Sequence, residues 1–269
     1  MRVGAVQLTS TADKDKNLAT AGRLIADAVV EGAELVVLPE MFNCLGTGAE
    51  LRAGAEPLDG PTALWLADQA VEHDITLVGG TFVERDEPRN HNTCCVFGPD
   101  GERLAAYRKI HLFDVEVPGA EFHESDAVGP GDEIVVVDVD EIRLGLSVCY
   151  DVRFPELYRI ATLQGATVVT VPAAFTAKTG PPHWEILLRA RAIENQVFVI
   201  AAGQRGSSND TLHWHGHSMI IDPWGTILAE NADTEGVIVA DLDLDAQTHV
   251  RDVLPSLANR RPAAYRWPD

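Results

Sequence analysis

One cysteine of the sequence stands where a strand is expected to give way to a helix. In EIRLGLSVCYDVRFPE, apolar and polar residues alternate up to Val148, so we expect Cys149 to end a strand and a helix to begin near Pro155. Nearby backbone N–H groups and the positive end of that helix favour a thiolate, which predicts a pKa below the usual value of about 8.5. Cys149 is therefore a candidate nucleophile, and a buried structural cysteine is the alternative.

Two further segments carry a candidate proton carrier and a candidate cation. Glu40 comes just after the apolar run LVVL, and it is flanked by Pro39, Met41 and Phe42. Burial there predicts a raised pKa, and a glutamate close to neutrality can accept and return a proton during acyl transfer. Lys109, in YRKIHLF, is suited to stabilise an oxyanion in a dry pocket or to pair with a glutamate. The alternatives are an exposed loop carboxylate and an exposed strand lysine.

Taken together, in this chain order and spacing, the three segments resemble the three catalytic blocks of the nitrilase superfamily of carbon–nitrogen hydrolases. The matching blocks are LPEMF, YRKIHLFD and CYDVRFPEL. The resemblance extends over nearly the whole chain, through GAVQL, TGPPHWEILLRARAIENQVF, GHSMIIDPWG and RRPAAY. It implies catalytic roles for Glu40, Lys109 and Cys149. The later blocks look most like the branch that contains the omega-amidases and the amidase acting on deaminated glutathione, and the closing segments favour the latter.

The resemblance implies hydrolysis of a non-peptide C–N bond in a small carboxylate-bearing amide, with release of ammonia and without a cofactor. Cys149 would form a thioester, Glu40 would move the protons, and Lys109 with the Tyr150 backbone N–H would hold the oxyanion. A nitrilase or an N-carbamoyl amino acid hydrolase would use the same groups. A thiol hydrolase with a histidine base ranks low, because no histidine lies in a segment resembling a partner block. A non-catalytic binding scaffold is the remote alternative.

The resemblance also implies a second glutamate beside the lysine. Glu124, in GAEFHESDAVGPG, is its expected counterpart, although Glu116 and Glu121 lie close enough in sequence to confuse the assignment. Such a carboxylate would position the substrate amide or the lysine. The alternative is a solvated loop acid.

Two more residues near these blocks are candidates for substrate binding. Arg153 is suited to bind a substrate carboxylate through two hydrogen bonds, and its alternative is an ion pair with Asp151 or Glu156. Trp184, in PPHWE, is expected either to line the pocket or to be a core aromatic residue at the start of a helix.

A histidine cluster is considered as a metal site and rejected. The three residues recur at every second position of LHWHGHSM, as a metal site on one face of a strand would require. The intervening Gly216 and the resemblance of the following block to a non-metal scaffold favour polar packing instead. No metal is therefore predicted for His213, His215 and His217.

The remaining pattern predicts an α/β fold in a single domain over residues 1–269. Helical periodicity precedes an apolar run four times, at 17–30 before 35–38, 61–73 before 75–83, 155–164 before 167–171, and 182–195 before 197–202. Hairpin signals occur at 97–101 and 221–226, and 114–132 is the longest loop-like stretch. About twelve strands favour two mixed sheets. The resemblance adds the layer count, a four-layer αββα sandwich, and a homodimer or higher homo-oligomer.

Charge and composition exclude several function classes. The 269 residues include 41 acidic and 21 basic side chains, a formal charge of -20, which disfavours binding to nucleic acid or to an anionic membrane surface. Only four basic residues are lysines, which suggests a salt-adapted protein, with an ordinary acidic protein as the alternative. The start of the chain reads as a strand rather than a leader, and no apolar run could span a membrane, so a cytoplasmic protein is expected. Without CxxC spacing, Cys44, Cys94 and Cys95 are expected to be free thiols that fill space.

Overall fold

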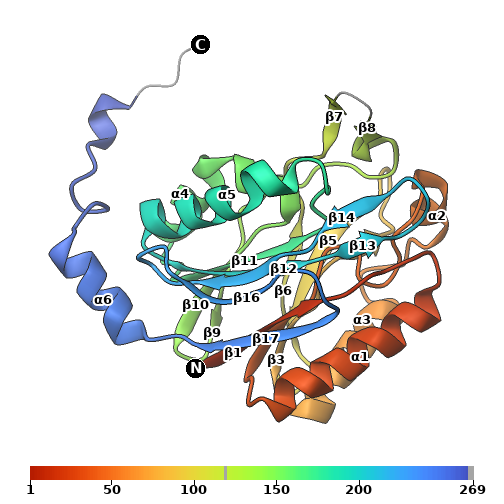
Figure 1. The fold of residues 1–269 in the computed structure, drawn as a ribbon, viewed down its shortest axis with the longest axis horizontal. Coiled ribbons are helices and arrows are strands. Elements are labelled where there is room, and N and C mark those ends of the chain that lie inside the picture. Colours follow the sequence, from red (N-terminus) through yellow and green to blue (C-terminus); the bar gives the residue numbers. More distant parts are fainter. Residues whose placement is uncertain (118–119, 266–269) are drawn as a thin grey trace.

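Two mixed β-sheets face each other in the computed structural model, which describes residues 1–117 and 120–265 (Figure 1). The first sheet has seven strands, of which all but β6 follow the order β17 (Gly236–Asp241), β1 (Arg2–Gln7), β2 (Leu35–Val37), β3 (Thr76–Val78), β5 (His91–Phe97), β4 (Phe82–Glu84). The seventh strand, β6 (Arg103–Arg108), also pairs with β5. Neighbours among β1, β2 and β3 are parallel, and the other pairs are antiparallel.

The second sheet has six strands and the same mixed character. Its order is β16 (Ile227–Asn231), β15 (Ser218–Ile221), β12 (Phe198–Gly203), β11 (Val168–Ala173), β10 (Ile142–Leu146), β9 (Val136–Val139). The neighbours β10, β11 and β12 are parallel, as expected for strands joined through helices. The hairpins expected at 97–101 and 221–226 are confirmed as the β5–β6 and β15–β16 connections.

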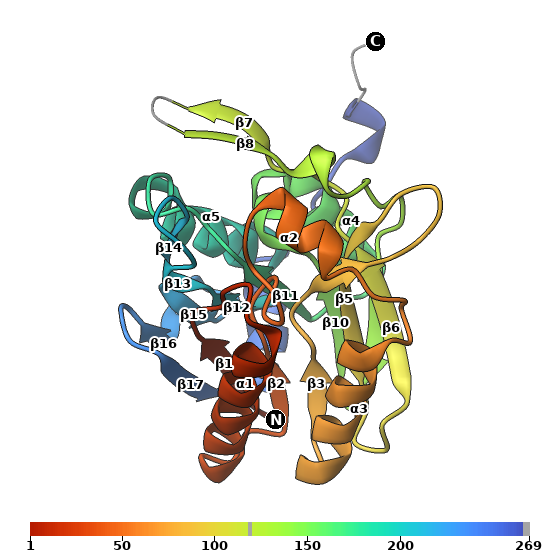
Figure 2. The same ribbon diagram turned by 90° about the vertical axis from the view of Figure 1, so that its right-hand side faces the viewer.

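A layer of helices covers the outer face of each sheet, which confirms the αββα arrangement (Figures 1 and 2). The seven-stranded sheet packs against α1 (Lys14–Val30) and α3 (Pro61–His73), and the six-stranded sheet against α4 (Pro155–Leu163) and α5 (Gly180–Asn195). The Asp13 carboxylate caps α1 by accepting from the Lys16 N–H, while α3 and α4 begin at a proline, which needs no N–H partner. These four helices lie where the sequence predicts them.

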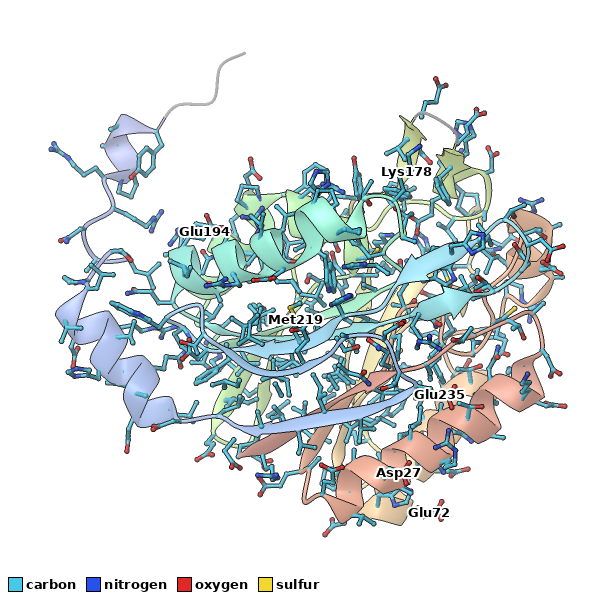
Figure 3. All side chains as sticks on the ribbon, viewed as in Figure 1. Asp27, Glu72, Lys178, Glu194, Met219 and Glu235 are labelled. Carbon is cyan, nitrogen blue, oxygen red and sulfur yellow. The ribbon has the colours of Figure 1, made fainter. Side chains whose placement is uncertain are left out.

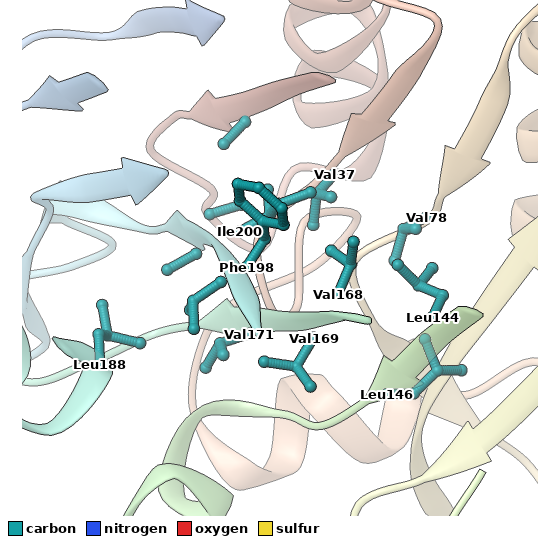
Figure 4. Close-up of a cluster of buried hydrophobic side chains, with 14 of the residues drawn as sticks. Val37, Val78, Leu144, Leu146, Val168, Val169, Val171, Leu188, Phe198 and Ile200 are labelled. Carbon is teal, nitrogen blue, oxygen red and sulfur yellow. The ribbon is translucent and has the colours of Figure 1, made fainter. Parts of the chain in front are cut away.

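The central strands of both sheets, such as β2, β3, β11 and β12, are buried on both faces, as the continuous apolar runs predict. Along β2, Leu35 and Val37 point into the core between the sheets, whereas Val36 and the following Leu38 pack under the helices. Figure 4 shows the inter-sheet core, where Val37 and Val78 of the first sheet lie near side chains of β10, β11 and β12. This dry core holds the two sheets at a fixed separation.

Shorter elements surround one edge of both sheets. They are α2 (Gly48–Ala53), the hairpin β7 (Asp114–Val117) and β8 (Ala120–His123), the hairpin β13 (Arg205–Ser207) and β14 (His213–His215), and the 3₁₀ turns η1 (Glu124–Asp126) and η2 (Cys149–Arg153). The stretch 114–132, expected to be a loop, therefore contains a hairpin and a 3₁₀ turn. The pairing of β7 with β8 was missed because each strand has only four residues, too few for the alternation of polar and apolar residues to distinguish a strand from a loop.

The strand expected at 75–83 is interrupted. β3 ends at Val78 and β4 begins at Phe82, because Gly80 has a positive φ of 53° and turns the chain. A Cβ atom at Gly80 would overlap the carbonyl oxygen of Pro39, so this glycine allows two turns to pack together.

The C-terminal helix packs at one edge of the six-stranded sheet. In α6 (Leu244–Val253) the buried Gln247 donates to the carbonyls of Thr167 and Gln196, just before β11 and β12, and the 3₁₀ turn η3 (Pro262–Ala264) follows beyond the four layers (Figure 1). Acidic side chains such as Asp27, Glu72 and Glu235 project from the outer surface (Figure 3). Among the described helices, none has the length and apolar character required to cross a membrane.

Candidate active site

Glu40 sits in a turn that leaves the seven-stranded sheet after β2. The chain is fixed there on both sides, because the Met41 N–H donates to Thr81 Oγ1 at 2.8 Å and the Glu40 carbonyl accepts from Gln204 Nε2 at 3.0 Å. Gln204 directly follows β12 of the other sheet. The Glu40 side chain is 4% exposed, so the carboxylate is buried as the sequence predicts.

Lys109 follows β6 in the same sheet. Its backbone N–H donates to the Asn92 carbonyl at 2.9 Å, and its own carbonyl accepts from the Gly131 N–H at 2.8 Å. The side chain is 1% exposed, and its ammonium donates to Glu40 Oε1 at 2.9 Å and to Glu124 Oε2 at 2.7 Å. The exposed-lysine alternative is therefore wrong.

Cys149 enters from the six-stranded sheet. β10 ends at Leu146, three residues before the strand end predicted at Cys149, and Cys149 opens η2 with a positive φ of 48°. The bend brings the buried thiol to the Glu40 carboxylate. The turn is held by Asp151, whose Oδ2 accepts from the Val148 N–H at 2.8 Å.

Glu124 resolves the ambiguity about the second glutamate. Of the three acids considered, Glu124 is the one that contacts Lys109, and it also accepts from the Phe113 N–H at 2.7 Å. Glu121 instead accepts from His123 at 2.6 Å, and Glu116 is exposed. The structure thus brings Glu40, Glu124, Lys109 and Cys149 together.

The charges of this cluster determine where its protons lie. Burial raises the pKa of Glu40, but the charge of Lys109 and hydrogen bonds from Lys109, Cys149 and the Ala174 N–H bring it below the ordinary value. Burial lowers the pKa of Lys109, but Glu124 and Glu40 raise it well above its usual range. In the resting site Glu40 is therefore an anion and Lys109 a cation.

Both pKa expectations for the proton-transfer pair need correction. The raised pKa expected for Glu40 is wrong, because its cationic partner outweighs burial. The lowered pKa expected for Cys149 is also wrong: burial, and then the negative charge of Glu40, raise it well above its usual range despite Lys109. The thiol keeps its proton beside a carboxylate that can accept it.

A cavity of about 260 Å³ opens above these groups. Glu40, Lys109, Glu124 and Cys149 line it, together with Tyr150. Its walls come from the region of α2, from the β7–β8 and β13–β14 hairpins and from the chain after β11, and they are largely apolar, including Leu45, Leu51, Phe113, Phe122, Phe175 and Trp214. A small molecule entering this cavity would meet the thiol in a largely dry environment.

The two expected substrate-binding side chains lie outside the cavity lining. Trp184 is fully buried, packs in a tilted arrangement against Phe175 at 4.8 Å between ring centroids and donates to the His217 carbonyl, so the expectation that it lines the pocket is wrong. Its indole is a core side chain behind Phe175. Arg153 lies over the rings of Tyr150 and Phe175, at 5.7 and 5.2 Å from their centroids. Both rings line the cavity, which places the guanidinium behind its wall.

The ion pair considered for Arg153 is not formed within the described residues. The Asp151 carboxylate is occupied by other donors: Tyr107 OH at 2.7 Å and His111 Nδ1 at 2.7 Å. Arg153 Nη1 instead lies 3.3 Å from His183 Nδ1. Among the residues that the structure describes, the positive charge of Arg153 therefore has no carboxylate partner.

The histidine triplet is split by the backbone. β14 ends at His215, and Gly216 and His217 have positive φ angles, so the strand does not continue through all three residues. His217 Nδ1 lies 2.7 Å from Glu230 and His213 Nδ1 2.6 Å from Ser207. Burial and the neighbouring His217 lower the pKa of His215 to about 4. Within residues 1–117 and 120–265, no group of acids, cysteines and histidines is arranged to hold a metal ion.

Sequence reasoning missed one polar residue at the centre of the site. Asn92, on β5, is fully buried, and its Nδ2 donates to Glu40 Oε1 and to Glu124 Oε1, each at 2.9 Å. The available signal was an amide inside an otherwise buried strand, HNTCCVF. The cysteines of this strand, Cys94 and Cys95, are free and buried, as is Cys44, as predicted.

Comparison with known proteins identifies the family. Residues 2–252 match the model described as Carbon-nitrogen hydrolase. The chain is 45% identical over 262 residues to the deaminated glutathione amidase of Synechocystis sp., covering 95% of this chain and 96% of that protein. It is 39% identical over 265 residues to the omega-amidase NIT2 of Homo sapiens, covering 98% and 96%.

A solved structure agrees with the sequence matches. The crystal structure of Saccharomyces cerevisiae Nit3, described as a member of branch 10 of the nitrilase superfamily, superposes with a TM-score of 0.89 at 34% identity, covering 98% of this chain and 97% of that one. The protein therefore belongs to the carbon–nitrogen hydrolases of the nitrilase superfamily. Within that superfamily it is an enzyme of the amidase branch.

Proposed function

We propose that this enzyme hydrolyses a small carboxylate-bearing amide through a thioester on Cys149 and releases ammonia. The observation that carries the proposal is the buried cluster in which Glu40 faces both the Cys149 thiol and the Lys109 ammonium at the floor of the cavity. The names of the relatives, a deaminated glutathione amidase and an omega-amidase, support the substrate class. No cofactor enters the reaction.

In the proposed reaction Glu40 accepts and returns a proton twice, once in each half of the cycle. As the Cys149 sulfur attacks the amide carbon, Glu40 accepts the thiol proton; when the C–N bond breaks, that proton leaves with the ammonia. Glu40 then takes a proton from a water molecule that attacks the thioester. The C–S bond breaks, the sulfur recovers a proton, and the acid leaves. The sum is amide plus water giving acid plus ammonia.

The oxyanion formed in both steps needs a donor in a water-poor site. Lys109 has three ammonium hydrogens, two of which bond to Glu40 and Glu124, so one is left for the oxyanion. The backbone N–H of Tyr150, the residue after the nucleophile, is the proposed second donor. Glu124 is proposed to keep Lys109 in place and to contact the departing nitrogen.

Arg153 is proposed to attract the carboxylate of the substrate. Its guanidinium lies against two rings of the cavity wall and has no carboxylate partner in the described chain. An arginine in this state can form charge-assisted hydrogen bonds to a ligand carboxylate after a rotation of its side chain. A nitrilase or an N-carbamoyl amino acid hydrolase could use the same catalytic groups, so substrate comparison is the decisive test.

The test measures ammonia release from alpha-ketoglutaramate, deaminated glutathione, a simple nitrile and an N-carbamoyl amino acid. Cys149→Ala should lower turnover of the preferred amide by about a thousandfold or more, while the control Cys44→Ala, a buried thiol beside Gly54, should keep it. Release from the nitrile or the carbamoyl compound alone would contradict the amide proposal but keep the nucleophile. Full turnover in Cys149→Ala would overturn the mechanism.

The assembly and compartment are also proposals. Exposed apolar side chains on α4 and α5 support a homodimer or higher homo-oligomer in which a second copy covers this face. The side chains are Ile160, Leu163, Ile186 and Ile193, which are 43%, 52%, 68% and 48% exposed. A measurement of the molar mass in solution tests this proposal.

Four free thiols, one of them the proposed nucleophile, support a reducing cytoplasmic location, which cell fractionation tests. The chain is proposed to act as a single domain over residues 1–269.

A further inference from the structure

Asn92 bridges the two glutamates of the active site. Its Nδ2 carries two hydrogens and lies 2.9 Å from Glu40 Oε1 and 2.9 Å from Glu124 Oε1, so each hydrogen is used on a different carboxylate. The opposite orientation of the amide would place its oxygen against two carboxylate oxygens, which repel it. The surrounding network therefore fixes the orientation of this amide.

The hydrogen bonds close into a ring. Asn92 bonds to Glu40 and Glu124, and Lys109 bonds to the same two carboxylates from the other side. The Asn92 carbonyl also accepts from the Lys109 backbone N–H at 2.9 Å. One residue of β5 thus contacts all three charged members of the ring, and both its backbone and its side chain take part.

The charge balance of the ring explains why an amide is needed. Two carboxylates and one ammonium leave an excess negative charge in a buried site, and burial favours protonation of one carboxylate. The amide of Asn92 supplies two further donors without adding a charge. A second cation would balance the excess charge but would also compete with Lys109 for Glu40.

We propose that Asn92 is a positioning residue that keeps Glu40 ionised and aligned with the Cys149 thiol. This inference rests on the proposed function, because it assigns Glu40 the role of proton acceptor. The charged and titratable groups that face Glu40 are Lys109 after β6, Glu124 from η1 and Cys149 from η2. Asn92 contacts the acids and the lysine rather than the cavity, whose lining does not include it.

The test is the pH dependence of Cys149 alkylation by iodoacetamide, with Cys149→Ala giving the background. Alkylation needs Glu40 as a proton acceptor, so the rate falls on the acid side as Glu40 becomes protonated. In Asn92→Leu this acid limb should move to higher pH by about one to two units, as expected when a carboxylate loses a hydrogen bond. Asn92→Asp, which adds a third carboxyl group to the ring, should move it further.

Turnover provides a second readout on the preferred substrate. Asn92→Leu should lower kcat by about tenfold or more, with KM changed by less than about threefold, because Asn92 acts on the proton acceptor and not on the substrate. Asn92→Ser, which keeps a single hydroxyl donor and adds no bulk, should show a smaller shift of the acid limb. If Asn92→Leu does not fold, Asn92→Ser is compared with wild type in its place.

The matched control is Thr93→Val on the same strand. Thr93 is also fully buried and donates to a carboxylate, Glu84 Oε2 at 2.7 Å, but that glutamate lies outside the site. This variant should lose stability without any shift of the acid limb. The inference is overturned if the acid limb of the alkylation profile lies at the same pH in the Asn92 variants as in wild type and in Thr93→Val. Because alkylation uses none of the panel substrates and does not measure ammonia release, that result is distinct from failure of the substrate panel, which would contradict the proposed function instead.

Discussion

In the resting site the proton lies on Cys149 and the negative charge on Glu40. Lys109 and the surrounding donors hold the pKa of Glu40 below its ordinary value, while burial and the adjacent anion raise the pKa of Cys149. A neutral thiol beside a carboxylate reacts when the carboxylate can take its proton as the new bond to sulfur forms. The proposed nucleophile is thus generated when an electrophile, either a substrate or an alkylating reagent, is in place.

Asp151 should be the residue whose neutralisation most disturbs the turn around Cys149. Its fully buried carboxylate accepts from Tyr107, from the backbone and side chain of His111, and from the Val148 N–H. Asp151→Asn should lower the free energy of unfolding by about 2 to 4 kcal/mol, because the amide leaves buried donors unpaired. Denaturant unfolding measures the change.

A more exposed aspartate provides the comparison for this variant. Asp86, whose side chain is 43% exposed, pairs with Arg108 at 2.8 Å. Asp86→Asn should cost less than about 1 kcal/mol, because such pairs are screened by water. Equal losses of unfolding free energy in the two variants would show that the hydrogen bonds of Asp151 stabilise the fold no more than an exposed ion pair does.

At the level of elements, turns rather than regular segments bring the reactive groups together. Glu40, Lys109 and Cys149 each lie just beyond the end of a strand, and the close approach of Gly80 to Pro39 sets the first of these turns. The strands supply rigid anchor points, and the short segments after them aim the side chains. α5 adds a further constraint, since it begins against the β13–β14 hairpin.

Gly180, the first residue of α5, should not tolerate a side chain. A Cβ atom there would overlap the imidazole ring of His215 on β14. Gly180→Ala should therefore lower the free energy of unfolding by about 1 to 3 kcal/mol, the range found for overpacking. Thermal or denaturant unfolding checks the loss.

Removing the whole opposing side chain should relieve this effect, because the Cβ atom of His215 also lies too close to the added methyl group. In Gly180→Ala with His215→Gly, the double variant should be more stable than the sum of the two single changes predicts. Strictly additive losses would mean that the two residues do not press on each other. The pKa of His215, lowered to about 4, keeps its ring neutral at pH 7, so the expected coupling is steric.

The sequence predicts the regular elements better than the contacts between them. The helix at 61–73 coincides with α3, because its proline start and apolar periodicity are local signals. The break at Gly80 and the bridging role of Asn92 depend on residues far along the chain, which local patterns do not contain. The pKa direction expected for Glu40 is wrong because it depends on Lys109, a partner from another element. The direction expected for Cys149 is wrong first because the thiol is buried and then because Glu40 lies beside it.

On the scale of the whole molecule, the formal charge of -20 is carried largely by the outer surface, where acids such as Asp27 and Glu235 project (Figure 3). Repulsion among such charges destabilises the compact state, and salt screens it. The melting temperature should therefore rise by at least about 5 °C between 0.05 and 1 M KCl at pH 7. Thermal unfolding followed by circular dichroism measures the change.

The control is the same pair of salt concentrations near pH 4.7, where the net charge is close to zero. The increment should shrink there, because little repulsion remains to be screened. Full stability and activity in dilute buffer at pH 7 would favour an ordinary acidic protein over a salt-adapted one.

The proposed catalytic groups are divided between the two parts of the chain. Residues before the exposed Asp132–Glu133 link contribute Glu40, Lys109 and Glu124, whereas Cys149 comes after it, and β17 returns to pair with β1. Neither fragment of a chain cut at this link holds both a proton acceptor and a nucleophile. Reassembly through the β17–β1 pair and the core between the sheets would restore both, which makes this fold a natural scaffold for a split-enzyme reporter of protein association.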